Sequence, residues 1–151
     1  MMTASAPSSV IVTLVTSDDF VIGAQVLAFS LAKVRSQLPL YCLVLSSLSK
    51  EAKALLSKQY HLIECEPIPN PHADVHVQQW LDVGFTKLRL WEQVQFEQIL
   101  YIDADCVVVR NVDHIFHHKR KVAFAAAPDV FPPGDVSLVL SFQFDVNTQP
   151  S

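Results

Sequence analysis

Short apolar runs alternate with amphipathic stretches over the first part of the chain. The first of these runs is rich in β-branched residues, as is typical of buried strands. The runs span residues 10–16, 40–45 and 61–65. Two stretches with apolar residues at helical spacing lie between them, 20–35 and 50–58, and each follows a serine that can cap a helix, Ser17 and Ser49. This order predicts an α/β fold with a mainly parallel sheet and right-handed crossovers.

The helix expected at 20–35 is apolar on most of its sides, unlike an ordinary surface helix. Its apolar residues include Val21, Ile22, Ala24, Val26, Leu27, Ala28, Phe29 and Leu31. We therefore expect other elements to cover it.

The second half of the chain is less regular. Three prolines and a lack of periodicity predict a loop at residues 66–81. A helix is expected at 86–95, with Leu88, Trp91 and Val94 on its buried side. The remaining expected elements are a strand at 99–102, a short helix at 112–117, a strand at 122–126 and a strand near 142–146.

The apolar run 99–102 leads directly into two carboxylates, Asp103 and Asp105. In parallel sheets, ligands bind beyond the carboxyl ends of the strands. Side chains of an extended segment alternate, so both carboxylates are expected on one side. Two hard oxygen ligands suit Mg²⁺ or Mn²⁺ carrying a phosphate-bearing substrate. The structural alternative for this short pattern is a solvated turn.

Composition narrows the class of protein. Half of the 151 residues are hydrophobic, which predicts one folded domain or part of one. Eleven basic and fifteen acidic residues give a net charge of −4 with no basic stripe, which argues against a nucleic-acid partner. Without a Cys-x-x-Cys pair, the cysteines are expected to be buried free thiols in a reducing compartment. They are Cys42, Cys65 and Cys106.

The N-terminal residues 1–9 are small and polar, and we expect them to be disordered. They lack the basic flank and apolar centre of a signal peptide. No apolar run has the length of a membrane helix. The sequence therefore predicts a cytoplasmic protein without a membrane partner.

Several ordered motifs together resemble glycosyltransferase family 8, and its glycogenin-like members in particular. The matching stretches are 12–20 with Gly23-Ala24, 86–91, 101–105, 111–116 and 127–129. Motifs in this order are far more specific than one Asp-x-Asp. The resemblance implies a Rossmann-like GT-A fold whose nucleotide-sugar-binding half covers residues 10–133, followed by a divergent tail at 134–151.

The resemblance also implies a metal-dependent, retaining hexosyltransferase that uses UDP-glucose or a related donor. The residues that would surround the uracil and ribose are Leu14, Thr16, Ser17 and Phe20. Lys87 would be the catalytic cation at the diphosphate. Asp103 would hold ribose and metal, the Ala104 backbone would lie beside the ribose, and Asp105 would bind Mn²⁺ (or Mg²⁺). The acceptor, a glycan or a protein, is not identified, and a homodimer is left open.

The chain departs from the glycogenin-like pattern at several positions. Ser17 and Phe20 stand where those proteins usually have Asn and Tyr, and Gln78 stands where an arginine precedes the lysine. The family's Phe-Asn-x-Gly-Val strand does not follow residue 133. We therefore expect a C-terminally truncated catalytic domain. The alternative is a non-catalytic nucleotide-sugar-binding or interaction fragment.

Two other chemistries fit parts of the sequence. Asp103 and its surroundings also resemble the first motif of haloacid-dehalogenase phosphatases, but that family opens its domain with the motif, whereas about a hundred residues precede it here. The spacing of His114, His117 and His118 can bind Zn²⁺ on a helix. The adjoining basic residues 119–121 oppose a cation, so a solvated helix end is favoured.

Overall fold

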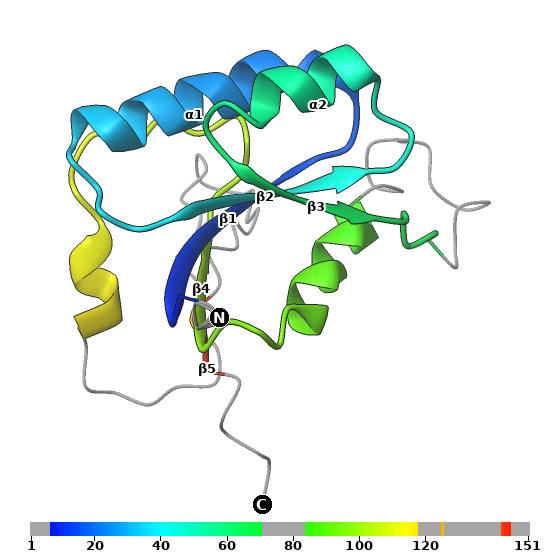
Figure 1. Cartoon of the computed structure of the whole chain (residues 1–151). Coiled ribbons are helices and arrows are strands. Elements are labelled where there is room, and N and C mark those ends of the chain that lie inside the picture. Colours follow the sequence, from blue (N-terminus) through cyan, green and yellow to red (C-terminus); the bar gives the residue numbers. More distant parts are fainter. Residues whose placement is uncertain (1–6, 71–83, 118–124, 126–142, 146–151) are drawn as a thin grey trace, which may run out of the picture.

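The protein forms a twisted sheet with helices on both of its faces (Figure 1). The computed structural model describes residues 7–70, 84–117, 125 and 143–145. Within them, the sheet has the order β3-β2-β1-β4-β5, in which the first four strands are parallel and β5 is antiparallel. The strands are β1 Ser9–Val15, β2 Leu40–Leu45, β3 His61–Cys65, β4 Gln98–Tyr101 and β5 Gln143–Asp145.

Two α-helices, α1 (Val21–Lys33) and α2 (Lys50–Leu56), lie over one face of the sheet (Figure 1). The 3-10 helix η3 (Phe85–Glu92) lies against the other face. Alternation along β1 serves both layers: Val15 packs in a cluster with α1 and α2, and Leu14 packs in a cluster with the η3 residue Leu90. The central strand is therefore buried on both faces, as its continuous apolar sequence predicts.

The first three strands and α2 confirm the sequence-based expectations closely. The strands at 40–45 and 61–65 have the predicted bounds. Ser49 caps α2, because its hydroxyl oxygen accepts a hydrogen bond of 3.0 Å from the Ala52 amide. Ser17 makes no such capping bond; a 3-10 turn, η1 (Asp18–Phe20), leads into α1, and Asp18 accepts a hydrogen bond from the Ser49 amide at 3.1 Å.

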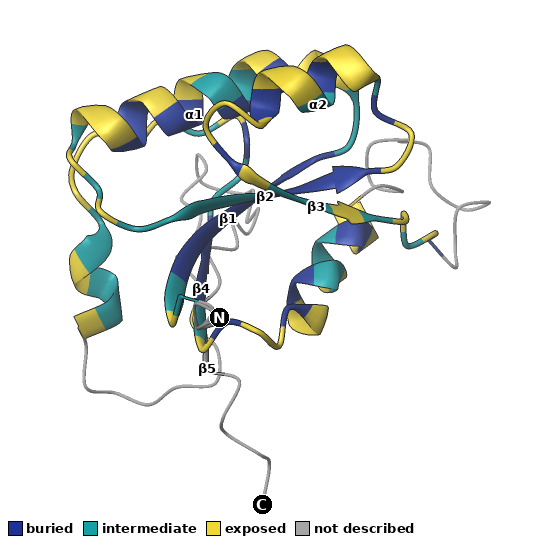
Figure 2. Ribbon diagram, in the orientation of Figure 1, coloured by how far each residue is buried: buried dark blue, intermediate teal, exposed yellow. Residues whose placement is uncertain are grey.

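The expectation that other elements cover α1 is wrong for its outer face (Figure 2). Ile22 and Phe29 are 72% and 65% exposed, and Val26 is also exposed. The inner face carries Leu27 and Leu31, which are fully buried. Apolar residues on all sides of a helix do not ensure its burial. Among the described residues, no element covers the side of α1 that faces away from the sheet.

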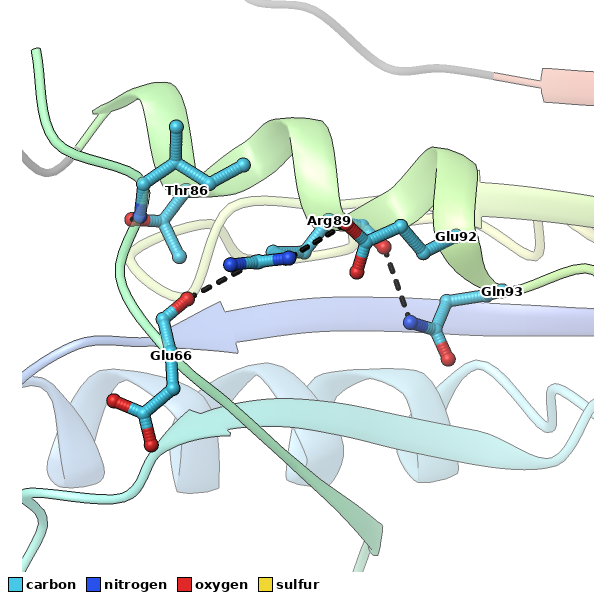
Figure 3. Close-up of polar contacts among 6 residues, drawn as sticks. Glu66, Thr86, Arg89, Glu92 and Gln93 are labelled. Atoms are coloured by element: carbon cyan, nitrogen blue, oxygen red, sulfur yellow. Dashed lines mark hydrogen bonds and ion pairs between the residues drawn. The ribbon is translucent and has the colours of Figure 1, made fainter.

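The helix expected at 86–95 exists as η3, but its predicted orientation is wrong. Leu88, Trp91 and Val94 are exposed, while Thr86, Leu90 and Gln93 are buried. Two polar residues can occupy the buried side because both are hydrogen-bonded. The Thr86 hydroxyl accepts from the Ile68 amide at 3.2 Å, and the Gln93 side chain donates to the Arg89 carbonyl at 3.0 Å (Figure 3).

The chain after β4 differs from the predicted pattern. The structure assigns residues 106–112 to no helix or strand. A 3-10 helix, η4 (Asp113–His117), replaces the short helix expected at 112–117. The strand predicted near 142–146 is confirmed as β5. The strand predicted at 122–126 lies almost wholly outside the described residues, as do the proposed domain boundaries at the tail. No helix in the described part is long and apolar enough to cross a membrane.

Candidate functional site

The carboxyl ends of β1 and β4 form the point at which the chain order of the sheet reverses. β1 pairs with β2 on one side and with β4 on the other, with Val12 opposite Tyr101. The chain leaving β1 passes through Thr16 and Ser17, and the chain leaving β4 passes through Asp103. In open α/β sheets such a switch point forms the crevice in which ligands bind.

Two side chains converge on one carboxylate oxygen of Asp103 beside this switch point. Lys87 Nζ lies 2.7 Å from Asp103 Oδ1, and the Tyr101 hydroxyl donates to the same oxygen at 2.6 Å. The Lys87 ammonium is also 5.3 Å from the centre of the Tyr101 ring, within the range of a cation–π contact. Lys87 and Asp103 are 16 residues apart, so it is the fold that pairs them.

Tyr101 is a site residue that we did not predict from the sequence. It is 1% exposed. Burial, and then the neighbouring Asp103 carboxylate, raise its pKa well above the usual value of 10.0, so the phenol remains a proton donor at neutral pH. Its place at the end of the apolar run and two residues before Asp103 was the available indication in the sequence.

The Asp103–Cys106 segment is a turn and not a continuation of β4. The Cys106 amide donates to the Asp103 carbonyl at 3.1 Å. The argument from strand alternation is therefore wrong, although neither carboxylate is buried: Asp103 is half-buried and Asp105 is exposed. Burial raises the pKa of the Cys106 thiol, and the negative charges of Asp105 and Asp103 raise it further. Both carboxylates therefore act on the same thiol.

The residues expected on the β1 side differ in their exposure. Leu14 is buried and packs in the apolar cluster that contains Tyr101, so its side chain belongs to the core. Thr16 and Ser17 are half-buried. Phe20 is 48% exposed.

Gly23 brings the first turn of α1 against the Asp103–Cys106 turn. A Cβ atom added to Gly23 would lie 2.8 Å from the Ala104 carbonyl oxygen. The residue can therefore only be glycine if both backbones keep their present positions. The Ala104 backbone, which was expected beside the ribose, is placed by this contact.

The segment that carries Lys87 is held by polar contacts on both sides of that residue (Figure 3). Thr86 anchors the Ile68 amide, as described above, and Arg89 donates to the Glu66 carbonyl at 3.0 Å. Arg89 also pairs with Glu92 at 2.6 Å. These contacts tie η3 to the chain that leaves β3 and so hold the backbone of Lys87 in place.

The two carboxylates fit part of a divalent cation site. Among the described residues, the contacts of Asp103 all use Oδ1, which leaves Oδ2 open, and Asp105 is exposed. The described residues hold no group of three or more potential ligands from His, Cys, Asp and Glu. Mg²⁺ and ions like it are commonly held by one or two carboxylates together with substrate phosphates, and Asp103 and Asp105 supply carboxylates of that chemistry.

Other residues considered from the sequence do not join the site. His114 and His117 lie on η4 and are exposed, and the described residues contain no metal-binding group around them. Gln78 and His118 lie outside the described residues. Cys42 is buried, whereas Cys65 and Cys106 are half-buried. The prediction of buried thiols is therefore confirmed only for Cys42.

Solved structures share this architecture. The galactosyltransferase LgtC matches with a TM-score of 0.65 and 14% sequence identity, over 90% of this chain and 57% of that chain. The glycosyltransferase GlyE of Streptococcus pneumoniae matches with a TM-score of 0.62 and 17% identity, over 91% and 34%. The fold is the Rossmann-like GT-A fold, as expected.

The chain belongs to glycosyl transferase family 8, whose model matches residues 11–144. Galactinol synthase 6 of Arabidopsis thaliana is 33% identical over 109 residues, which cover 71% of this chain and 32% of that protein. Glycogenin-1 of Caenorhabditis elegans is 28% identical over 123 residues, covering 79% and 28%. The predicted family is confirmed, and the match extends beyond residue 133. The chain spans about a third of the length of these relatives.

Proposed function

We propose that this chain is the donor-binding part of a family 8 hexosyltransferase that transfers glucose from UDP-glucose with retention and depends on Mn²⁺. The observation that carries the proposal is the meeting of Lys87, Tyr101 and Asp103 at the switch point between β1 and β4. A cation, a proton donor and a carboxylate at this place suit a ligand with a diphosphate and a ribose.

The nucleoside would lie at the end of β1. The exposed ring of Phe20 offers a stacking face for uracil, although it has no hydroxyl group to donate. Thr16 and Ser17 are half-buried and would supply hydroxyl groups near the base and ribose. Leu14 would act only as part of the apolar floor, since its side chain is packed in the core.

The diphosphate would lie between the two strand ends. Asp103 and Asp105 would hold Mn²⁺ or Mg²⁺, which when bound would neutralise charge on the leaving diphosphate as a Lewis acid. Lys87 would add a fixed positive charge at the same phosphates. The ribose would be held by the Asp103 carboxylate and approach the Ala104 backbone, whose position the α1 contact determines.

Binding of a nucleotide sugar without transfer is the second candidate. Two observations support it. The matched region covers about a third of the relatives' length, and the polar residues described at the site are those that we assign to binding the sugar donor. We also propose that the acceptor is a glycan or a protein, that the protein is cytoplasmic and that it can form a homodimer.

Calorimetric titration with UDP-glucose tests the proposal. We expect heat of binding in the presence of Mn²⁺ and a large loss of that heat without the ion or in Asp105→Asn. Glu51→Gln, an exposed carboxylate on α2, is the matched control and should bind as the unchanged protein does. Equal, negligible heats from folded protein with and without Mn²⁺ would contradict donor binding. Release of UDP in the presence of sugar acceptors separates transfer from binding alone.

A further inference from the structure

The segment that follows the Asp103–Cys106 turn runs along α1 instead of joining the sheet (Figure 1). Residues 106–112 belong to no helix or strand. Such a segment has no ladder of backbone hydrogen bonds to set its position, so side chains must do this. We call residues 104–113 the α1-following segment; it begins within the turn and ends at the first residue of η4.

The middle of the α1-following segment is held by Ser30 of α1. The Ser30 hydroxyl oxygen accepts a hydrogen bond of 2.9 Å from the Val108 amide, and the hydroxyl donates to the Leu27 carbonyl at 2.7 Å. Ser30 is buried, and it lies 78 positions from Val108 in the sequence. Both hydrogen-bonding functions of this hydroxyl are therefore used, one of them to hold a distant backbone.

The far end of the segment is held where α1 ends. The Asp113 carboxylate accepts from the Ser36 hydroxyl at 2.6 Å and from the Gln37 amide at 2.8 Å. Asn111 donates to the Arg35 carbonyl at 3.2 Å. Arg35 has the left-handed φ of 59° that commonly ends a helix, and this costs energy in a residue with a side chain.

Apolar packing beneath the segment is compatible with these contacts but less specific. Val108 and Val112 pack against the cluster that contains Leu27 and Leu31, while Val107 on the other side is exposed. Valine side chains tolerate small sliding movements, whereas a hydrogen bond is lost after a shift of about 1 Å. The polar contacts therefore determine the register of the segment along α1.

We infer that Ser30 and Asp113 are positioning residues for the donor and metal site. By fixing the α1-following segment at its middle and far end, they hold the Ala104 backbone and the Asp105 carboxylate where the proposed site needs them. The contact of Gly23 with the Ala104 carbonyl completes this arrangement at the near end. The inference rests on the proposed function for the site, but the arrangement itself is open to a separate measurement.

The two residues would act on the fraction of molecules in which the turn has its binding-competent position. A turn that samples several positions binds its cation only in the competent one, and the apparent dissociation constant rises as that fraction falls. Removing one side-chain hydrogen bond shifts such an equilibrium by a factor of about 2 to 12. The loss should be larger for Ser30, which is nearer the turn, than for Asp113.

Two readouts on the full chain test the inference. Hydrogen exchange at the Val108 amide should become faster in Ser30→Ala by about 2- to 12-fold. The dissociation constant for Mn²⁺ should rise by a similar factor, and by less in Asp113→Asn. The matched control is Ser57→Ala at the C-cap of α2. Its hydroxyl donates to the Ala54 carbonyl at 3.0 Å and holds no distant segment among the described residues. This variant should change neither readout.

The outcomes distinguish a positioning role from a structural one. A merely structural role would lower the melting temperature of Ser30→Ala and leave the Mn²⁺ constant of the folded protein unchanged, which would overturn the inference. If the unchanged protein binds no Mn²⁺, the proposed function fails. The holding of the segment is then judged by hydrogen exchange alone, and unaltered exchange at Val108 and Cys106 in Ser30→Ala would overturn that too.

Discussion

Two buried threonines differ in whether their hydroxyl groups are hydrogen-bonded. Thr13 in β1 and Thr86 in η3 are both 0% exposed. The Thr86 hydroxyl accepts a hydrogen bond from the Ile68 amide at 3.2 Å, whereas the Thr13 hydroxyl has no hydrogen-bond partner among the residues that the structure describes. A buried hydroxyl costs free energy unless it is hydrogen-bonded, so the two residues should contribute to stability with opposite sign.

We predict that valine, which has nearly the same shape as threonine, separates these two cases. Thr86→Val should lower the free energy of unfolding by about 1–3 kcal/mol, because the Ile68 amide loses its acceptor. Thr13→Val should be neutral or raise it by up to about 1 kcal/mol. Denaturant unfolding of both variants measures the difference. Equal destabilisation by the two changes would contradict this account of the core.

Gly23 gives a second prediction at the scale of one residue. Replacing a helical glycine by alanine ordinarily stabilises a protein by about 0.5–1 kcal/mol. Here the new Cβ would lie 2.8 Å from the backbone oxygen of Ala104, and a backbone atom cannot move aside cheaply. Gly23→Ala should therefore lower the melting temperature and weaken Mn²⁺ binding. A higher melting temperature, measured by differential scanning calorimetry, would show that the two backbones separate without cost.

At the scale of elements, the sequence predicts the strands better than it predicts the faces of the helices. Apolar runs such as 40–45 lie between turn residues, so local chemistry determines them. The buried face of η3 depends instead on partners elsewhere in the chain, because Thr86 is buried through its bond to Ile68. The exposed Ile22 and Phe29 on α1 follow the same logic, since a pattern of apolar residues does not say how many layers cover a helix.

The candidate site could be predicted in part for the same reason. Asp103 and Asp105 follow an apolar run, and the structure confirms that this run is a strand, β4, which ends just before them. The pairing of Lys87 with Asp103 joins η3 to the end of β4, which spacing alone does not reveal. The turn at Asp103–Cys106 was also missed, because a continuing apolar run resembles a continuing strand.

At the scale of the whole molecule, the two-sided core buries several groups that lose a proton only at high pH. Burial raises the pKa of the Cys42 thiol from 9.0 to about 12. Burial also raises the pKa of Tyr60, whose hydroxyl donates to the Ala24 carbonyl at 2.6 Å, and that of Tyr101. The folded state therefore keeps these protons at pH values at which the unfolded chain releases them.

This difference predicts the direction of the stability change with pH. A group whose pKa is raised in the folded state contributes its full stability below its unfolded pKa, and the contribution is lost as the pH rises. The free energy of unfolding should therefore fall above about pH 9, where unfolded cysteine begins to ionise. Urea unfolding between pH 7 and 11 measures this slope. Cys42→Ala should reduce it, and the same slope in that variant would contradict the assignment to Cys42.

Diffraction from crystals containing Mn²⁺ and UDP, recorded at the manganese absorption edge, tests the central claim most directly. The account predicts one anomalous peak within about 2.5 Å of carboxylate oxygens from both Asp103 and Asp105, with the Lys87 ammonium facing the diphosphate. An ordered ion or UDP bound away from the ends of β1 and β4 would contradict it.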